Sequence, residues 1–292
     1  MVKILHGDTV ESYALIPRFF DKLVESNPGT CAALEMDDSC HFKFCFMAFG
    51  PSIEGWKYCR PIISVDGTFL KCKFGGILLR ASSQDGNNQI FPLAFAIVDF
   101  ENVASWTWFF EKIRSSFSER ANLFIVSDRH LSIPKGVLRV FPDVEYCVCT
   151  KHLLSNLKLH FKGPLLDKYF FSCAYAYTVE EFEYHMRCMK SVCSNIRDYL
   201  SSVGFEKWSR AYSHRRSKVA FTMKSHLTYW AENILRLEHE KSRRLLVDPI
   251  STTEYQVMDV NQQFIVKLNV GCCSCRVWDV EEIPCAHALA VL

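Results

Sequence analysis

The chain has 292 residues, of which 49% are hydrophobic and 23% charged, and 23 of them are Phe. This length and composition exclude a disordered chain and allow one large domain or two smaller ones. The net charge of +2 neither requires nor excludes a nucleic-acid partner, because only a clustered basic face attracts phosphate strongly. Basic clusters occur at residues 214–218 and 241–244, and solvated helix faces or loops remain the alternative for each.

The N-terminal segment has acids and a glycine within its first ten residues, so it lacks the apolar run of a signal peptide. The longest apolar stretch, residues 90–98, is far shorter than the roughly 20 residues that span a bilayer. We therefore expect a soluble, intracellular protein with no membrane partner. Most of the 14 Cys are scattered through apolar segments, as expected for single buried thiols.

The first half of the chain alternates between strand and helix patterns. Residues 8–26 have helical spacing and end at "NPG"; the segments 41–50, 60–67, 76–86 and 90–99 are typical of strands. A helix over 105–117, with Ser105 as its N-cap, precedes a strand at 123–128, a helix at 134–141 and a strand at 144–149. From residue 60 onward, the order three strands, helix, strand, helix, strand predicts an α/β sheet that begins as a meander and grows through helical crossovers.

The second half is predicted to be helical from residue 152 to about 240. Strand alternation returns over residues 255–270 and leads into a cluster of cysteines. A polar, Pro-containing break at 246–252 marks the expected boundary between these parts.

Two acids follow apolar strand patterns. Asp66 ends "PIISV" and Asp128 ends "LFIVS". A single acid in such a place is usually a turn-former or a helix cap. If the two strands are neighbours, however, both carboxylates emerge at one sheet edge, where they could hold two Mg²⁺ or Mn²⁺ ions roughly 4 Å apart for phosphodiester chemistry.

Four ligand-type residues near the C-terminus are spaced C-x-C-x9-C-x-H: Cys273, Cys275, Cys285 and His287. Two close pairs of soft or borderline ligands suit tetrahedral Zn²⁺, and four protein ligands make such a site structural rather than catalytic. Buried thiols with an incidental His are the alternative. Cys272 adjoins a ligand and could compete for the ion.

Taken together, these motifs resemble the transposases of Mutator-like elements. The resemblance runs through "CRPIISVDGTFLKCKFGGILLRASSQDGNNQIFPLAFAIVDFENVASWTWFFEKI", "FIVSDRH", "RVFPDVEYCVCTKHLLSNLK" and "CCSCRVWDVEEIPCAHALAVL". It implies that Asp66 and Asp128 are the first two acids of a DDE triad, and that the C-terminal ligands form a SWIM zinc finger. The family's CxxH feature is matched by Cys149 and His152, for which we expect a structural role, since two ligands do not close a zinc site.

The third acid of the triad is not evident. The family places it in a segment resembling T-S-N-x-A-E-S-x-N, and the nearest echo here is "AEN", residues 231–233. Glu232 is therefore the candidate third acid, and a solvated glutamate on an amphipathic helix is the alternative. Glu101 also matches a residue habitual in the family, and its place before a helix favours capping or structural hydrogen bonding.

The resemblance implies an α/β fold: an RNase H-like mixed sheet core with a helical insertion and a small C-terminal zinc finger. The expected parts are a helix-and-strand flank at 1–58, the transposase core at 59–152, the helical insertion at 153–245 and the finger at 253–292.

The implied function is that of a nuclear, zinc-binding, DNA-associated transposase derivative. Its core would cleave and join DNA with Mg²⁺ or Mn²⁺ and would be impaired without a third acid. The alternative is a catalytically inactive, domesticated regulator of transcription that binds DNA or other proteins. A plain RNase H-type nuclease would keep the acids but leave the finger unexplained.

Overall fold

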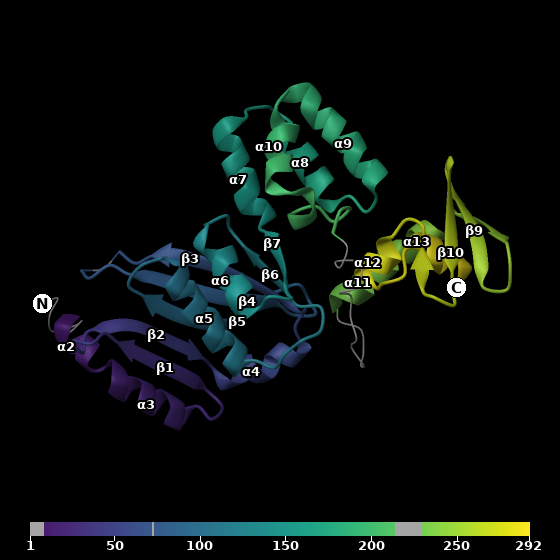
Figure 1. The fold of residues 1–292 in the computed structure, drawn as a ribbon. Helices are drawn as coiled ribbons and strands as arrows, with labels where there is room; N and C mark the ends of the chain where they lie inside the picture. Colours follow the sequence, from purple (N-terminus) through teal and green to yellow (C-terminus); the bar gives the residue numbers. More distant parts are fainter. Residues whose placement is uncertain (1–8, 72, 214–228) are drawn as a thin grey trace, which may run out of the picture. The chain divides into compact units, whose positions relative to one another are not determined.

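A computed structural model describes residues 9–71, 73–213 and 229–292 (Figure 1). The chain divides into two compact units, one made of residues 1–85 and 89–146 and the other of residues 86–88 and 147–292. The basic cluster His214–Lys218 lies outside the described residues. Among the described helices, none has both the length and the apolar character needed to cross a bilayer.

The first unit is built on a seven-stranded sheet. Its strands are β1 (Cys31–Met36), β2 (Phe42–Ala48), β3 (Ile62–Phe69), β4 (Ile77–Gln84), β5 (Ile90–Val98), β6 (Phe124–Ser127) and β7 (Glu145–Val148). Their order is β1-β2-β5-β4-β3-β6-β7. Strands β3, β4 and β5 form the expected antiparallel meander, and β6 joins β3 in parallel after a helical crossover. The predicted mixed α/β fold is confirmed.

Strand β1 was not expected, because "CAALEM" has little β-branched or aromatic character. It pairs with β2, which pairs in turn with β5 at the far side of the meander. Pro92 lies inside the central strand β5, next to a register shift in its pairing with β4. An irregularity of this kind accommodates a residue that has no N–H to donate to the ladder.

Short helices precede and follow the first strands: α2 (Thr9–Ala14), α3 (Ile16–Ser26), α4 (Gly50–Gly55) and the 3₁₀ helix η1 (Trp56–Tyr58). The single helix expected over 8–26 is therefore divided at Leu15. Pro17, near the start of α3, explains the division: its ring lacks an N–H and collides with the carbonyl four residues earlier in a continuous helix.

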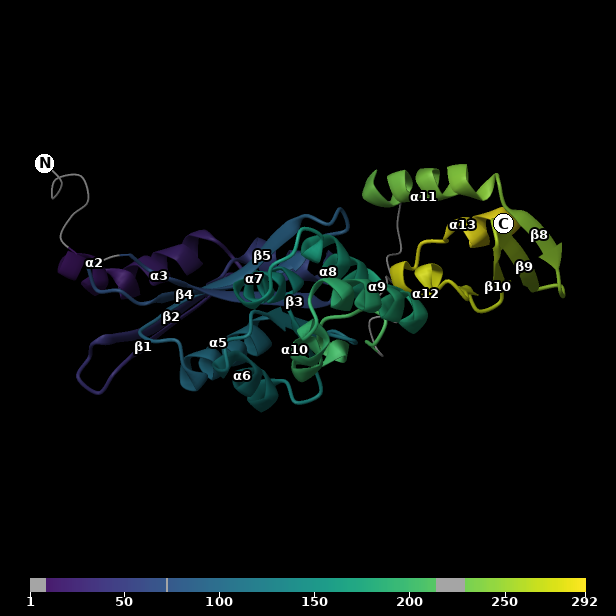
Figure 2. The ribbon, with the colours of Figure 1, turned by 90° about the horizontal axis from the view of Figure 1, so that it is seen from above.

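Helices α5 (Val103–Ser116) and α6 (Ser132–Val140) lie side by side and cover one face of the sheet (Figures 1 and 2). The N-cap of α5 is Asn102, whose side chain accepts from the backbone N–H of Ser105 at 3.0 Å. The expected cap, Ser105, is instead buried in the first turn and donates to the carbonyl of Phe100. Behind it, Trp106, Phe109 and Phe110 are fully buried against the sheet.

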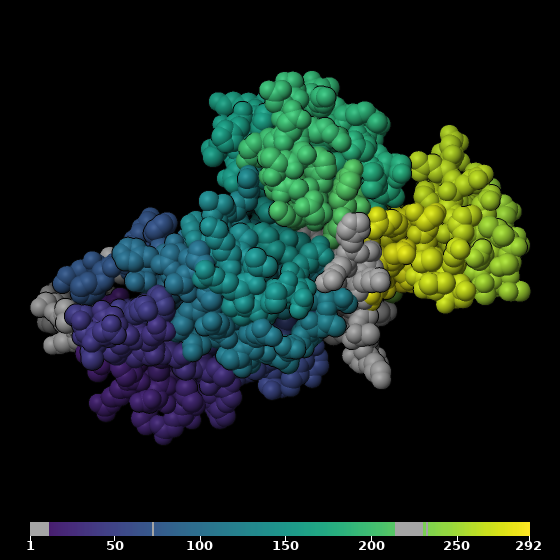
Figure 3. Space-filling model, viewed as in Figure 1, coloured from purple at the N-terminus to yellow at the C-terminus, as the bar shows by residue number. Residues whose placement is uncertain are grey.

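The second unit begins with helices α7 (Thr150–His160), α8 (Leu166–Tyr175), α9 (Val179–Val192) and α10 (Ile196–Val203), followed by the 3₁₀ helix η2 (Phe205–Lys207). In Figure 3 they form one body of teal to green atoms. Its centre is aromatic: Trp208 stacks on Phe170 at 5.3 Å between ring centroids and contacts Phe182. The expectation of a mostly helical segment is confirmed for the described residues.

The C-terminal part contains α11 (Tyr229–Ser242), strands β8 (Leu246–Pro249), β9 (Glu254–Asp259), β10 (Gln262–Lys267) and β11 (Cys272–Cys273), then α12 (Val277–Glu281) and α13 (Ala286–Val291). The polar break expected at 246–252 is wrong in part, because residues 246–249 pair with β9 as the edge strand of a four-stranded sheet. Pro249 suggested a break in the sequence, but a proline is tolerated in an edge strand. Helix α11 contacts α13, and Glu238 accepts from the backbone N–H of Ala286 at 2.9 Å.

Candidate metal centre and acid pair

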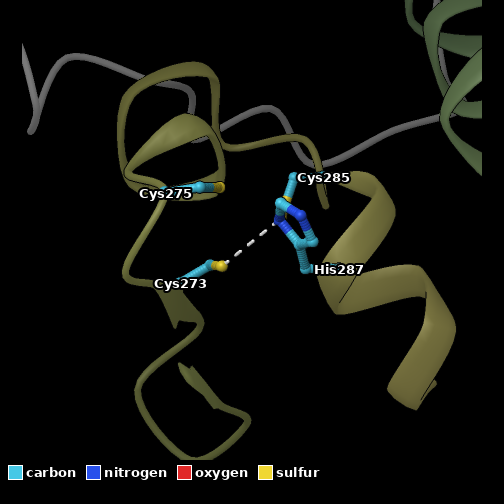
Figure 4. A group of neighbouring side chains, drawn as sticks. All are labelled: Cys273, Cys275, Cys285 and His287. Carbon is cyan, nitrogen blue, oxygen red and sulfur yellow. Dashed lines mark hydrogen bonds between the residues drawn. The ribbon is translucent and has the colours of Figure 1, made fainter. Parts of the chain in front are cut away.

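The four residues expected to bind zinc converge. Cys273 ends β11, Cys275 follows it in a loop, Cys285 is the N-cap residue of α13 and His287 lies in the first turn of that helix. One ligand atom from each lies within 4.8 Å of the others (Figure 4). In the part of the chain that the structure describes, these are the residues that meet as a group of three or more potential metal ligands.

The orientation of His287 matches that of a metal ligand. Its Nδ1 atom lies 3.8 Å from the sulfur of Cys273 and 3.9 Å from that of Cys285. Its Nε2 atom is buried without a hydrogen bond and lies 3.5 Å from a carboxylate oxygen of Asp259. The ring is fixed by stacking on Phe264, with 4.0 Å between centroids. Nδ1 would therefore bind the ion, while Asp259 would orient the other nitrogen.

The protonation states of the clustered side chains would change when a metal binds. Hydrogen bonds from the thiols of Cys273 and Cys275 lower the pKa of Cys285, which favours one thiolate in the cluster. Burial acts to lower the pKa of His287, but hydrogen bonds with Cys275 and Cys285 raise it to about 10. Because a metal binds thiolate and neutral imidazole, its binding would release protons. Three soft sulfurs with one imidazole suit tetrahedral Zn²⁺.

Neighbouring residues shape the loop that carries the first two ligands. Asp279 accepts from the backbone N–H of Cys273 at 3.1 Å, and Arg276 adopts a left-handed conformation with φ 63°. Cys272, paired with Lys267, points to the opposite face of β11 from Cys273 and is not part of the cluster. The positions of Asp259 and Asp279 beside the cluster could not be predicted from the sequence, since they depend on the tertiary fold and not on motif spacing.

The acid pair lies on neighbouring strands, as the metal hypothesis requires. Strands β3 and β6 are parallel, with Ile62 opposite Phe124 and Ser64 opposite Val126. Continuing this register by two residues brings Asp66 level with Asp128. Asp128 directly follows β6, as expected. Asp66 does not end its strand, because β3 continues to Phe69 and stays paired with β4.

Each of these acids already has partners. Arg80, opposite Asp66 on β4, donates from Nη2 to Oδ2 of Asp66 at 2.5 Å. Oδ1 of Asp128 accepts from the backbone N–H of His130 at 3.1 Å, which is the hydrogen bond of a turn-former. The Arg80 contact depends on strand register, and for that reason the sequence alone did not reveal it.

The remaining acids do not complete a triad within the described residues. Glu101 accepts from the indole N–H of Trp106 at 3.1 Å and lies 3.5 Å from Nδ1 of His130, which agrees with structural hydrogen bonding. Glu232 lies in α11, but its side chain is outside the described residues.

The CxxH pair lies at the start of α7. Cys149 is its half-buried N-cap residue, and His152 is exposed one turn later. They do not belong to a group of three or more potential ligands among the described residues, and their structural role stays a prediction.

Comparison with known proteins gives matches to both parts. Residues 62–156 match the MULE transposase domain and residues 258–292 match the SWIM zinc finger. The chain is also similar to Protein FAR1-RELATED SEQUENCE 4 of Arabidopsis thaliana, with 21% identity over 182 residues. That match covers 60% of this chain but only 25% of the relative's length. The chain thus carries a MULE transposase domain and a C-terminal SWIM zinc finger.

Proposed function

We propose that the chain is a zinc-binding, DNA-associated derivative of a Mutator-like transposase that acts in the nucleus. The observation that carries this proposal is the uneven distribution of charge. Residues 147–245 contain 17 Lys and Arg against 9 Asp and Glu, although the whole chain has a net charge of only +2. A segment with this excess attracts the phosphate backbone even where base contacts are few.

The exposed lysines of the helical segment supply the test. Lys151, Lys162 and Lys190 are all exposed, and reversing them to Glu changes the charge by six units. We expect duplex DNA affinity to fall by more than about tenfold at low salt, with a shallower salt dependence, because fewer counterions are then released. Fluorescence anisotropy between 50 and 200 mM salt measures both quantities.

A matched control reverses Lys22, Lys57 and Lys135, which are exposed in the other unit. Its effect should be much smaller than that of the first set. Equal losses from both sets would assign DNA binding to overall charge, and an unchanged affinity in the first set would refute the proposal.

A second function, metal-dependent DNA cleavage, is favoured by the alignment of Asp66 with Asp128. Two carboxylates level on adjacent strands would hold divalent ions for water activation and leaving-group stabilisation. Arg80 would weaken metal binding, because a metal ion must displace its guanidinium group from Asp66. The side chain of Arg80 is 57% exposed, so solvent screens the pair and we expect a loss of metal affinity of only several-fold. The lack of an evident third acid, for which Glu232 is the candidate, is then the larger obstacle.

Nicking of supercoiled plasmid in Mn²⁺ separates these outcomes. If the core is active, Asp66→Asn removes nicking and Arg80→Thr increases it several-fold. If wild type, Asp66→Asn and Arg80→Thr all show the same background, the inactive, regulator-like alternative stands. Lys135→Thr, a change of an exposed cation elsewhere in the unit, controls for loss of positive charge.

A further inference from the structure

The nine residues between the second and third metal ligands form a loop that contacts the helical segment of the same unit. This loop, residues 276–284, includes α12 and lies between the clustered residues Cys275 and Cys285. Two of its side chains, those of Arg276 and Glu281, make the contacts. We call residues 276–284 the docking loop.

Arg276 binds backbone carbonyls of the helical segment. Its Nη1 atom donates to the carbonyl of Tyr177 at 2.9 Å and lies 3.5 Å from that of Ala211. These carbonyls follow α8 and η2, at points where the chain leaves helical structure. A guanidinium with several donors is well suited to bridge two such acceptors.

Glu281, at the other end of α12, joins an ion pair and a phenol. Its Oε1 atom lies 3.0 Å from Nη1 of Arg210 and accepts from the hydroxyl of Tyr177 at 3.0 Å. Arg210 in turn lies over the ring of Tyr177, 4.5 Å from its centroid. Burial raises the pKa of Tyr177 to about 12, so this phenol keeps its donor proton at neutral pH.

The contact is more protected from solvent than an ordinary surface pair. The side chains of Arg210 and Glu281 are 23% and 25% exposed, and five groups from two parts of the chain interlock. Partly buried, charge-assisted hydrogen bonds of this kind contribute more than isolated surface ion pairs.

The charge of the finger argues against phosphate as its partner. Residues 246–292 contain six Asp and Glu but only two Lys and Arg, and one of those two is Arg276, which is already engaged with Tyr177. Bound Zn²⁺ with three thiolates would add one more negative charge. A surface of this sign repels a phosphate backbone.

We infer that the zinc finger is a protein-docking module whose partner is the helical segment of the same chain, and that the metal holds the docking loop in its docking shape. Arg276 directly follows a ligand, and Glu281 lies four residues before the next. Metal release would let these two side chains separate, and the helical segment would then lose contacts that lie outside the finger itself.

Hydrogen–deuterium exchange of the full chain, with and without a zinc chelator, tests this inference. We expect removal of zinc to speed exchange about fivefold in peptides that cover residues 172–178 and 208–213, which contain no metal ligand. Glu281→Arg should produce the same change in protein that retains its zinc, as measured by elemental analysis. Glu254→Gln, a loss of an acid elsewhere in the finger, should leave these peptides unchanged.

A charge exchange keeps the test decisive if single variants are unstable. Arg210→Glu and Glu281→Arg should each expose the helical peptides, and the double variant should restore their protection because the ion pair is rebuilt in reverse. The inference fails if these peptides exchange alike with and without zinc while finger peptides respond. It also fails if the double variant behaves as the sum of the singles.

Discussion

The two ring nitrogens of His287 have different surroundings. Nδ1 faces sulfur atoms, whereas Nε2 is buried 3.5 Å from Asp259. A carboxylate in that position selects the tautomer that leaves Nδ1 unprotonated and raises its basicity as a ligand. We therefore expect Asp259 to influence metal binding without touching the ion.

Replacing this carboxylate should weaken metal binding. We expect Asp259→Asn to lower zinc affinity about tenfold, at the low end for such neighbours, because Asp259 is half-exposed. Competition with a chromogenic chelator measures the change. Asp248→Asn, an exposed acid on the adjacent strand β8, is the control. Equal affinities for wild type and Asp259→Asn would remove Asp259 from the metal centre.

Single functional residues were predictable where they belong to a local sequence motif with characteristic spacing. The four ligands follow from C-x-C-x9-C-x-H, and both core acids follow from apolar strand patterns. Arg80 and Glu281 were not predictable, because their partners are 14 and 71 residues away along the chain and depend on register and packing. Spacing identifies residues that share one motif; contacts between motifs need the fold.

Among the elements, helices α5 and α6 meet at a glycine. A Cβ atom on Gly136 would lie 3.0 Å from Cβ of Trp106 and 3.2 Å from the backbone nitrogen of Thr107. Trp106 is fully buried and cannot move away without disturbing the core. Close approach of the two helices thus explains a residue that is otherwise unfavourable within a helix.

The close approach of the two helices decides whether a substitution at Gly136 stabilises or destabilises the protein. Alanine would normally stabilise a helix by about 1 kcal/mol, but here we expect Gly136→Ala to lower the free energy of unfolding by about 1–3 kcal/mol. Denaturant titration measures it, with Lys135→Ala on the exposed side of the same helix as control. A stabilised Gly136→Ala protein would show that the helices have room to separate.

Helices α9 and α10 are joined by a two-pronged ion pair. Arg197 donates to both carboxylate oxygens of Glu183, at 2.7 and 2.9 Å, and the hydroxyl of Tyr212 donates to the same group. The hydrogen bonds from Arg197 lower the pKa of Glu183 from its usual 4.5. This geometry makes the stability of the helical segment sensitive to acid.

A carboxylate with a lowered pKa stabilises the fold above its unfolded pKa, and that contribution is lost as pH falls through the folded value. We expect Glu183→Gln to cost about 1 kcal/mol at pH 7 and progressively less below pH 4.5. Urea titrations at several pH values measure the difference, with Glu206→Gln, an exposed acid in η2, as control. A cost that is independent of pH would contradict the role of the ion pair.

Elements were predictable where their hydrophobic pattern is strong. The meander and the crossover helices follow from alternation and helical spacing, and they were placed within a few residues. Strands β1 and β8 were missed because Ala, Glu, Asp and Pro dominate them. Both lie at edges of their sheets, where pairing with one neighbour and not composition decides the conformation.

Over the whole molecule, separate cores stabilise the two units. The core of the first unit is aliphatic and aromatic, whereas the finger has a small core that includes the ligands Cys273 and Cys285. A core of that size would depend on a bound metal for stability. None of the four clustered ligands belongs to the first unit, so we expect its stability not to depend on zinc.

Metal removal should therefore affect the second unit and leave the first unit intact. We expect about one zinc per chain, lost in Cys285→Ser, and a chelator should abolish protection of finger amides while leaving the thermal transition of the first unit within about 1 °C. Calorimetry and hydrogen exchange measure both, and Cys272→Ser is the matched control because it lies outside the cluster. A folded wild-type protein without zinc would refute the assignment.

The salt bridge between Arg80 and Asp66 neutralises a carboxylate on β3 without a metal ion. A metal neutralises an acid only when it is bound, whereas a guanidinium does so permanently at any cation concentration. The positive charge of Arg80 therefore compensates the carboxylate of Asp66 even when no divalent metal ion is bound. Asp66 therefore contributes to the structure of the sheet whether or not the core cleaves DNA.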